Sequence, residues 1–278
     1  GLNDSIEVSY YRTEPHKTDS DSDGLSDGEE VLTYNTDPWD SDTDDDLLND
    51  SAEVLIYSTD PHNPDCDNDR LLDGEEISYG TDPYDNDTDG DGIIDGTEVK
   101  AYGTDPASDD TDNDGLTDYE EIYGKNITTL NKTVKTDPLD NDTDDDGLSD
   151  GDEANGYGTD PLDQDTDNDG LTDYEEVVDY STDPLDQDTD NDGLTDYEEV
   201  VDYPTDPNDP DTDNEGLTDY EEVLIYNTDP NDSDTDGDSL SDFDEVNGIN
   251  VPGVGWVRTD PTDPDTDGDG LSDDEEVN

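Results

Sequence analysis

A repeat of 23 residues dominates this sequence. Residues 163–185 read DQDTDNDGLTDYEEVVDYSTDPL, and residues 186–208 follow with almost the same letters, DQDTDNDGLTDYEEVVDYPTDPN. Repeats of this length are typical of arrays in which each unit packs mainly on its neighbours. The tripeptide TDP marks the period and begins at Thr36, Thr59, Thr81, Thr104, Thr136, Thr159, Thr182, Thr205, Thr228 and Thr259.

Two intervals between TDP copies are longer, because residues 124–135 and 247–258 are inserted at the same point of the repeat. Both insertions contain β-branched residues around a central turn candidate, so each predicts a small β-hairpin. We expect residues 1–278 to form one array, with a partial repeat in residues 1–18 and units that begin at the eleven aspartates given below as position 1. Since the sequence starts and stops inside a repeat, we expect it to be a stretch of a longer array.

The composition favours cations as partners. Only 24% of the residues are hydrophobic and the formal net charge is −83, and a chain of this kind stays disordered unless its charge is neutralised. Nucleic acid and anionic membrane surfaces carry the same sign of charge and are excluded as partners. The sequence has no apolar run long enough to insert into a membrane.

Each repeat contains the pattern D-x-D-x-D-G-L-x-D-x-x-E. These residues match positions 1, 3, 5, 6, 7, 9 and 12 of an EF-hand calcium loop. Three alternating carboxylates can converge on one ion because the glycine turns the backbone sharply. Position 7 offers its main-chain carbonyl, position 9 often acts through water, and the glutamate closes the shell with two oxygens. An all-oxygen set of this kind favours Ca²⁺ over Mg²⁺.

The predicted ligands are the same six positions of all eleven loops. Position 1 is Asp19, Asp42, Asp65, Asp87, Asp110, Asp142, Asp165, Asp188, Asp211, Asp234 and Asp265. Position 3 is Asp21, Asp44, Asp67, Asp89, Asp112, Asp144, Asp167, Asp190, Asp213, Asp236 and Asp267. Position 5 is Asp23, Asp46, Asp69, Asp91, Asp114, Asp146, Asp169, Asp192, Glu215, Asp238 and Asp269.

The remaining three positions follow in the same loops. Position 7 is Leu25, Leu48, Leu71, Ile93, Leu116, Leu148, Leu171, Leu194, Leu217, Leu240 and Leu271. Position 9 is Asp27, Asp50, Asp73, Asp95, Asp118, Asp150, Asp173, Asp196, Asp219, Asp242 and Asp273. Position 12 is Glu30, Glu53, Glu76, Glu98, Glu121, Glu153, Glu176, Glu199, Glu222, Glu245 and Glu276.

Four loops depart from the pattern. Leu47, Arg70 and Ser239 replace the glycine at position 6, and Glu215 is one methylene longer than the usual aspartate at position 5. If the loop needs a positive φ at position 6, each of the first three replacements costs roughly 1 kcal/mol or more. We therefore expect these four sites to bind calcium more weakly.

A second ion in each repeat is an open alternative. Further carboxylates lie just before many loops and in the TDP tripeptides, and they could hold such an ion. The competing interpretation is that TDP is only a turn in which aspartate caps the chain reversal before proline. The carboxylates before the loops are Asp140, Asp163, Asp186, Asp209, Asp232 and Asp263.

Calcium is also expected to drive folding. A unit offers only four or five apolar groups, such as Leu171, Tyr174 and Val177, with a spacing that fits a short helix of about two turns starting inside the loop. Their burial is too small to offset the conformational entropy of 23 residues. The bound ions must supply the difference. The predicted fold is a calcium-stabilised repeat array, an elongated solenoid or rod made mostly of loops with short helices and the two hairpins.

The phrases DTDNDGLTDYEEVVDYSTDP and DTDGDGLSDDEEVN resemble the thrombospondin type 3 repeat in its bacterial and archaeal form. The resemblance implies calcium ions along an extended array, usually a spacer or stalk in an extracellular protein. Animal members carry disulfides between units, whereas Cys66 is the only cysteine here. Stiffness would then come from ions and tyrosine packing alone.

Three classes of function remain to be compared. An enzyme is not expected, because no nucleophile is paired with a base and a site repeated eleven times is a poor single active centre. The favoured function is a calcium-stiffened extracellular spacer, stalk or filament segment. The alternative is a calcium reservoir or an acidic template for mineral.

Four of the eight basic residues lie in the two insertions, which could dock onto an identical neighbouring chain or be tolerated surface loops.

Overall fold

Each repeat consists of an acidic loop followed by one short helix. In a computed structural model, which describes residues 7–277, the helices begin at or just after position 9 of the loop, as the sequence predicts. Residues 1–6 of the expected partial repeat lie outside the described residues. In the labels, η marks helical turns of the wider π type, which continue several of the α-helices or replace them.

The helices are short throughout the described chain. In the first half they are η1 (Glu7–Tyr11), α2 (Asp27–Glu29), η2 (Glu30–Tyr34), α3 (Asp50–Ala52), η3 (Glu53–Tyr57), α4 (Asp73–Tyr79), α5 (Asp95–Thr97), η4 (Glu98–Tyr102) and α6 (Asp118–Tyr123). In the second half they are η5 (Asp152–Tyr157), η6 (Glu175–Tyr180), η7 (Glu198–Asp202), η8 (Glu221–Tyr226), α7 (Asp242–Asn247) and α8 (Asp273–Val277).

Side-chain caps and left-handed residues explain where the helices start and stop. Ser26 begins α2 with a capping box, in which its hydroxyl accepts from the N–H of Glu29 and the Glu29 carboxylate accepts from the N–H of Ser26. Asn35 ends η2 with a φ of 62°, and its N–H donates to the carbonyl of Glu30 at 2.5 Å. A residue in the left-handed region satisfies an otherwise unpaired helix carbonyl, so the helix cannot continue into TDP.

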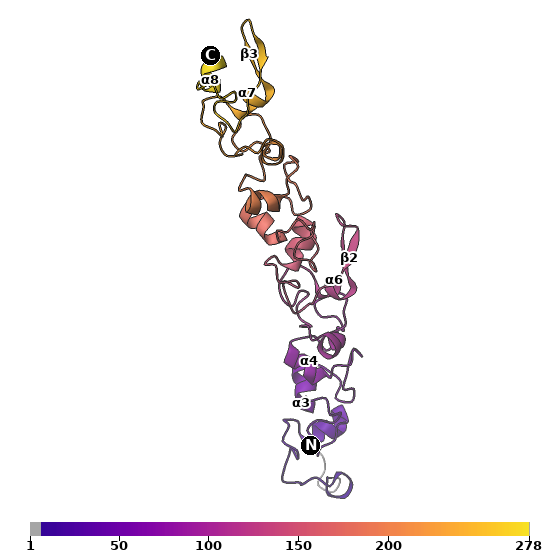
Figure 1. Cartoon of the computed structure of the whole chain (residues 1–278). Coiled ribbons are helices and arrows are strands. Elements are labelled where there is room, and N and C mark those ends of the chain that lie inside the picture. The colour runs from indigo at the N-terminus through magenta and orange to yellow at the C-terminus, as the bar shows by residue number, and fades with distance from the viewer. Residues whose placement is uncertain (1–6, 278) are drawn as a thin grey trace. The chain divides into compact units, whose positions relative to one another are not determined.

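The two insertions form the predicted hairpins, and each follows a helix (Figure 1). Strands β1 (Lys125–Ile127) and β2 (Lys132–Val134) come after α6, and strands β3 (Ile249–Val251) and β4 (Gly255–Val257) come after α7. The pair β3–β4 is antiparallel, with Asn250 opposite Trp256.

The chain divides into two compact units. Unit 1 comprises residues 1–126 and 133–141, and unit 2 comprises residues 127–132 and 142–278. Within each unit the buried apolar side chains are mainly those at position 7 of the loops, such as Leu71 and Leu194, both 0% exposed. The core is therefore one leucine or isoleucine per repeat. The elongated shape of the whole chain stays a prediction.

No helix within residues 7–277 has the length and apolar character needed to cross a membrane.

Candidate metal centres

The backbone of each loop turns its N–H groups toward the acidic side chains. In the loop that begins at Asp165, the N–H of Gly170 donates to Asp165 Oδ2 at 3.1 Å and the N–H of Asp169 donates to Asp167 Oδ1 at 3.1 Å. The N–H of Leu171 donates to Asp169 Oδ1 at 2.7 Å. These bonds fix the three carboxylates in place and leave Asp167 Oδ2 without a hydrogen-bond partner.

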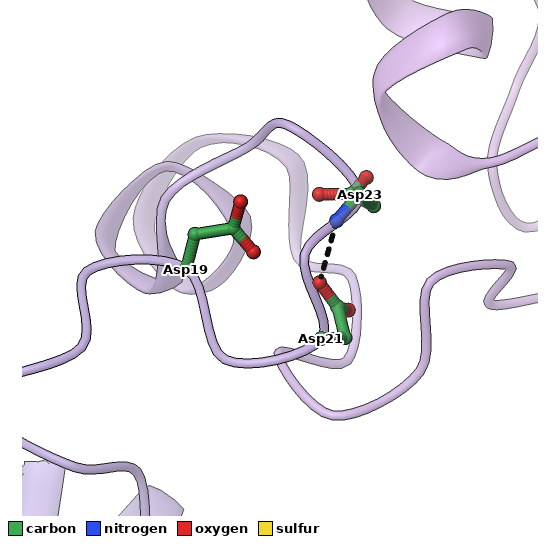
Figure 2. Close-up of side chains that lie close together, drawn as sticks. All are labelled: Asp19, Asp21 and Asp23. Carbon is green, nitrogen blue, oxygen red and sulfur yellow. Dashed lines mark hydrogen bonds between the residues drawn. The ribbon is translucent and has the colours of Figure 1, made fainter.

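The carboxylates at positions 1, 3 and 5 converge. Figure 2 shows Asp19, Asp21 and Asp23 turned toward one another, with the N–H of Asp23 donating to Asp21 Oδ1 at 3.2 Å. One oxygen from each of the three lies within 4.8 Å of the other two. The same holds in the loops that begin at Asp42, Asp65, Asp87 and Asp110, and six further groups of this kind occur among the described residues. The structure thus brings positions 1, 3 and 5 together in those loops, and their role as metal ligands stays a prediction.

In the ten loops before the last, the glutamate at position 12 is buried and has at least one unpaired carboxylate oxygen. Glu199 is 0% exposed, its Oε1 accepts from the hydroxyl of Thr205 in TDP at 3.1 Å, and its Oε2 has no hydrogen-bond partner. The threonine was not among the predicted site residues, although its fixed place after the helix was a usable signal. An unpaired buried Oε2 recurs at Glu30, Glu53, Glu76, Glu98, Glu121, Glu153, Glu176, Glu199, Glu222 and Glu245.

Position 3 leaves a matching oxygen. Its Oδ2 is buried without a partner at Asp21, Asp44, Asp67, Asp89, Asp144, Asp167, Asp190, Asp213 and Asp236. Buried polar atoms in proteins are almost always satisfied, so a recurring pair of unsatisfied carboxylate oxygens points to a missing cation. The residues present therefore fit the calcium ion that the sequence pattern implies.

The raised pKa values of the position-12 glutamates also indicate that these sites need a nearby positive charge. Burial, together with the charges of Asp167 and Asp169, raises the pKa of Glu176 from 4.5 to about 9. The same causes raise the pKa of Glu76 to about 9. A carboxyl group with such a pKa is protonated at neutral pH unless a positive charge lies beside it. A bound divalent cation would supply that charge.

Position 9 has a different environment from the one its place in the pattern predicts. Asp196 Oδ1 accepts from the N–H of Thr189 at 2.9 Å and its Oδ2 accepts from the hydroxyl of the same threonine at 2.7 Å. The hydroxyl in turn accepts from the N–H of Asp183 in TDP at 2.9 Å. Position 9 thus connects the loop to the preceding turn. Its predicted role as a ligand, often through water, stays a prediction.

Position 5 reaches into the following repeat. Asp169 Oδ2 accepts from the N–H of Tyr197 at 2.8 Å, and Asp192 Oδ2 accepts from the N–H of Tyr220 at 2.7 Å. Both donors are position 10 of the next loop, 28 residues along the chain. Sequence reasoning missed this bond, because nothing in a single repeat shows which main-chain groups of its neighbour lie against it.

The following repeat also buries the site. Leu271 in the last loop of the sequence is 48% exposed, and Glu276 is exposed as well, whereas position 12 is at most 1% exposed in the ten loops before it. Within each unit, a site is therefore covered by the loop and helix that come after it.

Backbone geometry at position 6 agrees with the expected strain. Leu47, Arg70 and Ser239 have φ values of 82°, 89° and 92°, in the region that favours glycine. Glu215 keeps both bonds of a position-5 carboxylate, accepting from the N–H groups of Leu217 and Phe243. The weaker binding expected at these four sites stays a prediction.

Replacing Ser239 by glycine should strengthen calcium binding at the tenth loop. Relief of the positive φ is worth roughly 1 kcal/mol, or about fivefold in affinity. Gly270→Ser is the matched reverse change, since Gly270 has a φ of 99° and a Cβ there would meet nothing within 4 Å. Calcium titrations of the two variants followed by calorimetry should shift in opposite directions. Equal affinities would show that backbone strain does not set the strength of the site.

TDP forms the turn that the second interpretation predicts. Asp183 Oδ1 accepts from the N–H of Leu185 at 3.2 Å, and the carbonyl of Asp183 accepts from the N–H of Asp186 at 3.0 Å. This bonding accounts for aspartate before proline without a metal. A second ion per repeat remains a prediction.

Comparison with known families gives a match over most of the chain. The model of the bacterial TSP3 repeat matches residues 19–41, 65–86, 87–108, 110–123, 142–164, 165–187, 188–210, 211–233 and 265–278. No curated protein matches the chain.

Among solved structures, the chain is similar to two described as the BSP domain and the B domain of a biofilm associated protein. The identities are 46% and 47% over 16% of this chain, with TM-scores of 0.15 and 0.16. The similar segments span 7% and 11% of those chains.

Proposed function

Because the chain belongs to the bacterial TSP3 repeat family, we propose that it is an extracellular calcium-binding structural protein, in which bound ions stiffen a spacer, stalk or filament segment. The observation that carries the proposal is the buried, unpaired Oε2 of the position-12 glutamate, repeated in ten successive loops. A buried negative charge without a partner is strongly unfavourable. The folded repeat therefore needs a cation.

The donor set supports calcium as that cation. Positions 1, 3, 5 and 12 present only carboxylate oxygens, with the main-chain carbonyl at position 7 as the expected fifth donor. Calcium accepts six to eight oxygens in variable geometry, whereas magnesium needs a tighter octahedron and retains its waters. When bound, the ion would supply charge neutralisation and a fixed centre for each loop.

An extracellular location is part of the proposal, because we expect the sites to have the affinity of extracellular calcium modules. Extracellular calcium modules bind with Kd values of about 10⁻⁴ to 10⁻³ M. Such sites are filled outside cells, where calcium is abundant, and empty in the cytosol. The proposal assigns no catalytic role to the carboxylates, since all of those in the loops are committed to holding ions or to hydrogen bonds within the array.

The basic residues of the two hairpins contact their own chain. Lys125 Nζ lies 2.7 Å from Glu120 Oε1, and Lys135 Nζ donates to the carbonyl of Ile122 at 2.6 Å. Lys132 pairs with Asp160. Three of the four basic groups that could dock onto an acidic neighbouring chain are thus already in use, and the fourth, on Arg258, donates from Nε to the carbonyl of Asn247. Docking of the hairpins onto an identical neighbouring chain stays a prediction.

A calcium reservoir or mineral template is the alternative. Such a protein needs exposed and independent carboxylates, and it takes up ions without becoming ordered. Here the closing glutamate is buried in the ten loops before the last, and in eight of them its carboxylate accepts from a threonine hydroxyl, which favours the structural role.

Glu199→Gln tests the function at one site. We expect the variant to bind one calcium ion fewer at millimolar calcium, or to bind it at least tenfold more weakly, because even partners of metal ligands change affinity by about 10- to 100-fold. Asp202→Asn is the control, since Asp202 is exposed and its substitution removes the same charge as Glu199→Gln. Native mass spectrometry counts the ions, and circular dichroism during titration shows whether uptake orders the chain. Full uptake without ordering would support the reservoir and contradict the structural role.

A further inference from the structure

Position 6 of a loop packs against position 10 of the next repeat. In most of these pairs one residue is glycine and the other has a larger side chain. In three consecutive junctions of unit 2 the ring of a tyrosine lies over the glycine of the loop before it. A Cβ placed on Gly193 would lie 3.0 Å from Cδ2 of Tyr220, tighter than nearly all real contacts of this kind. The three pairs are Gly147–Tyr174, Gly170–Tyr197 and Gly193–Tyr220.

Unit 1 contains the reverse arrangement. Leu47 occupies position 6, and the residue at position 10 of the next repeat is Gly74. A Cβ placed on Gly74 would lie 2.5 Å from the carbonyl oxygen of Asp46 and 2.9 Å from Cβ of Leu47. No side chain fits there. The next junction has the same arrangement, with Arg70 at position 6 and Gly96 at position 10 of the following repeat. A Cβ on Gly96 would collide with the carbonyl oxygen of Asp69.

Backbone conformation explains the glycines at position 6 but not those at position 10. Glycine at position 6 is favoured by its positive φ, as at Gly193 with 115°. Gly74 and Gly96 lie in the first turns of α4 and α5 and have no positive φ. Glycine is a poor helix former, so its presence there calls for a second reason. The close approach of the preceding loop supplies that reason.

The same relation holds along the sequence. At the junction between the first two loops, Gly24 is followed by Ser51, and a Cβ on Gly24 would lie 3.1 Å from Ser51 Oγ. Of the ten pairs that the sequence contains, only Ser239 with Asp274 lacks a glycine. Both of its members are small.

We propose that this pair of positions is the surface by which each repeat accepts its successor. A loop with glycine at position 6 accepts an aromatic residue at position 10 of the next repeat, and a loop with a side chain there accepts glycine. The partner that the surface fits is thus a second repeat of the matching kind. The two kinds cannot be exchanged without opening the junction.

Two substitutions that introduce the same side chain test this. Gly74→Tyr places a ring against Leu47, whereas Ser51→Tyr places one against Gly24. In the full chain with saturating calcium, we expect amide hydrogen exchange in the helix of the altered repeat to rise at least tenfold for Gly74→Tyr and to change less than threefold for Ser51→Tyr. Similar rates in the two variants would overturn the proposal.

The double variant Leu47→Gly/Gly74→Tyr separates complementarity from a general loss of folding. It removes the Leu47 side chain and leaves the Asp46 carbonyl oxygen in place, so exchange should fall clearly below that of Gly74→Tyr alone. The reverse conversion, Gly193→Leu/Tyr220→Gly, should exchange more slowly than Gly193→Leu alone. Failure of both double variants to recover protection would show that the pair does not select its neighbour.

Discussion

Removing calcium with a chelator should abolish most amide protection in residues 7–277. The chain carries 91 acidic residues against eight basic ones, and its buried apolar residues amount to about one leucine or isoleucine per repeat. Without cations, the buried carboxylates repel one another and the apolar surface cannot offset the loss of conformational entropy. Hydrogen exchange followed by mass spectrometry measures the effect at the level of single repeats.

Two controls separate specific binding from charge screening. In 1 M NaCl the screening length falls to about 3 Å, so salt should reduce long-range repulsion while leaving the sites unfilled. Magnesium supplies the same charge with a geometry that suits the loop less well. We expect protection to return with calcium and not with sodium, and magnesium to restore less of it. Full protection in chelator and salt would contradict the idea that bound ions hold the repeats together.

The effect of pH on stability should reverse sign when calcium is removed. Burial and neighbouring carboxylates raise the pKa of Glu153 to about 9 and that of Glu199 to about 8, from an ordinary 4.5. Between the ordinary pKa of 4.5 and the raised pKa of about 8 to 9, the metal-free fold binds more protons than the unfolded chain does. Its stability therefore falls as the pH rises through that window. With calcium the ligands must be ionised, protons compete with the metal, and stability rises with pH instead.

Thermal unfolding at pH 5.5 and pH 8.5 checks this expectation. In chelator, any residual cooperative transition should lie at a higher temperature at pH 5.5. In saturating calcium the order should be the opposite. Glu199→Gln removes one of the groups responsible and should reduce the pH dependence in chelator, whereas the exposed control Asp202→Asn should leave it unchanged. The same sign in both conditions would show that the buried glutamates do not govern stability.

The sequence predicted the local parts of the repeat well. The alternation of Asp165, Asp167 and Asp169 before a glycine predicted a loop, and the spacing of apolar residues such as Leu171 and Tyr174 predicted a short helix that starts inside it. The hairpins followed from β-branched residues around a turn. All of these features depend on residues within about a dozen positions of one another, which is the range over which backbone preferences act.

Contacts between repeats could not be predicted in the same way. The bond from Tyr197 N–H to Asp169, and the packing of Tyr220 on Gly193, join residues 27 or 28 positions apart. One repeat taken alone does not show how closely the next one approaches. The threonine partners of Asp196 and Glu199 were missed for a related reason, since a hydroxyl near an acidic loop has many possible partners and only the folded turn selects one.

The main-chain bonds that join position 10 of one loop to position 5 of the loop before it run in one direction along the chain. The N–H of Phe243 donates to Glu215 and that of Tyr119 donates to Asp91, so at these junctions the later helix covers the earlier candidate site. A nick or a damaging substitution in one repeat therefore exposes the site on its amino-terminal side and spares the site on its carboxyl-terminal side. We therefore expect the loss of bound ions to spread from a damaged repeat toward the amino terminus.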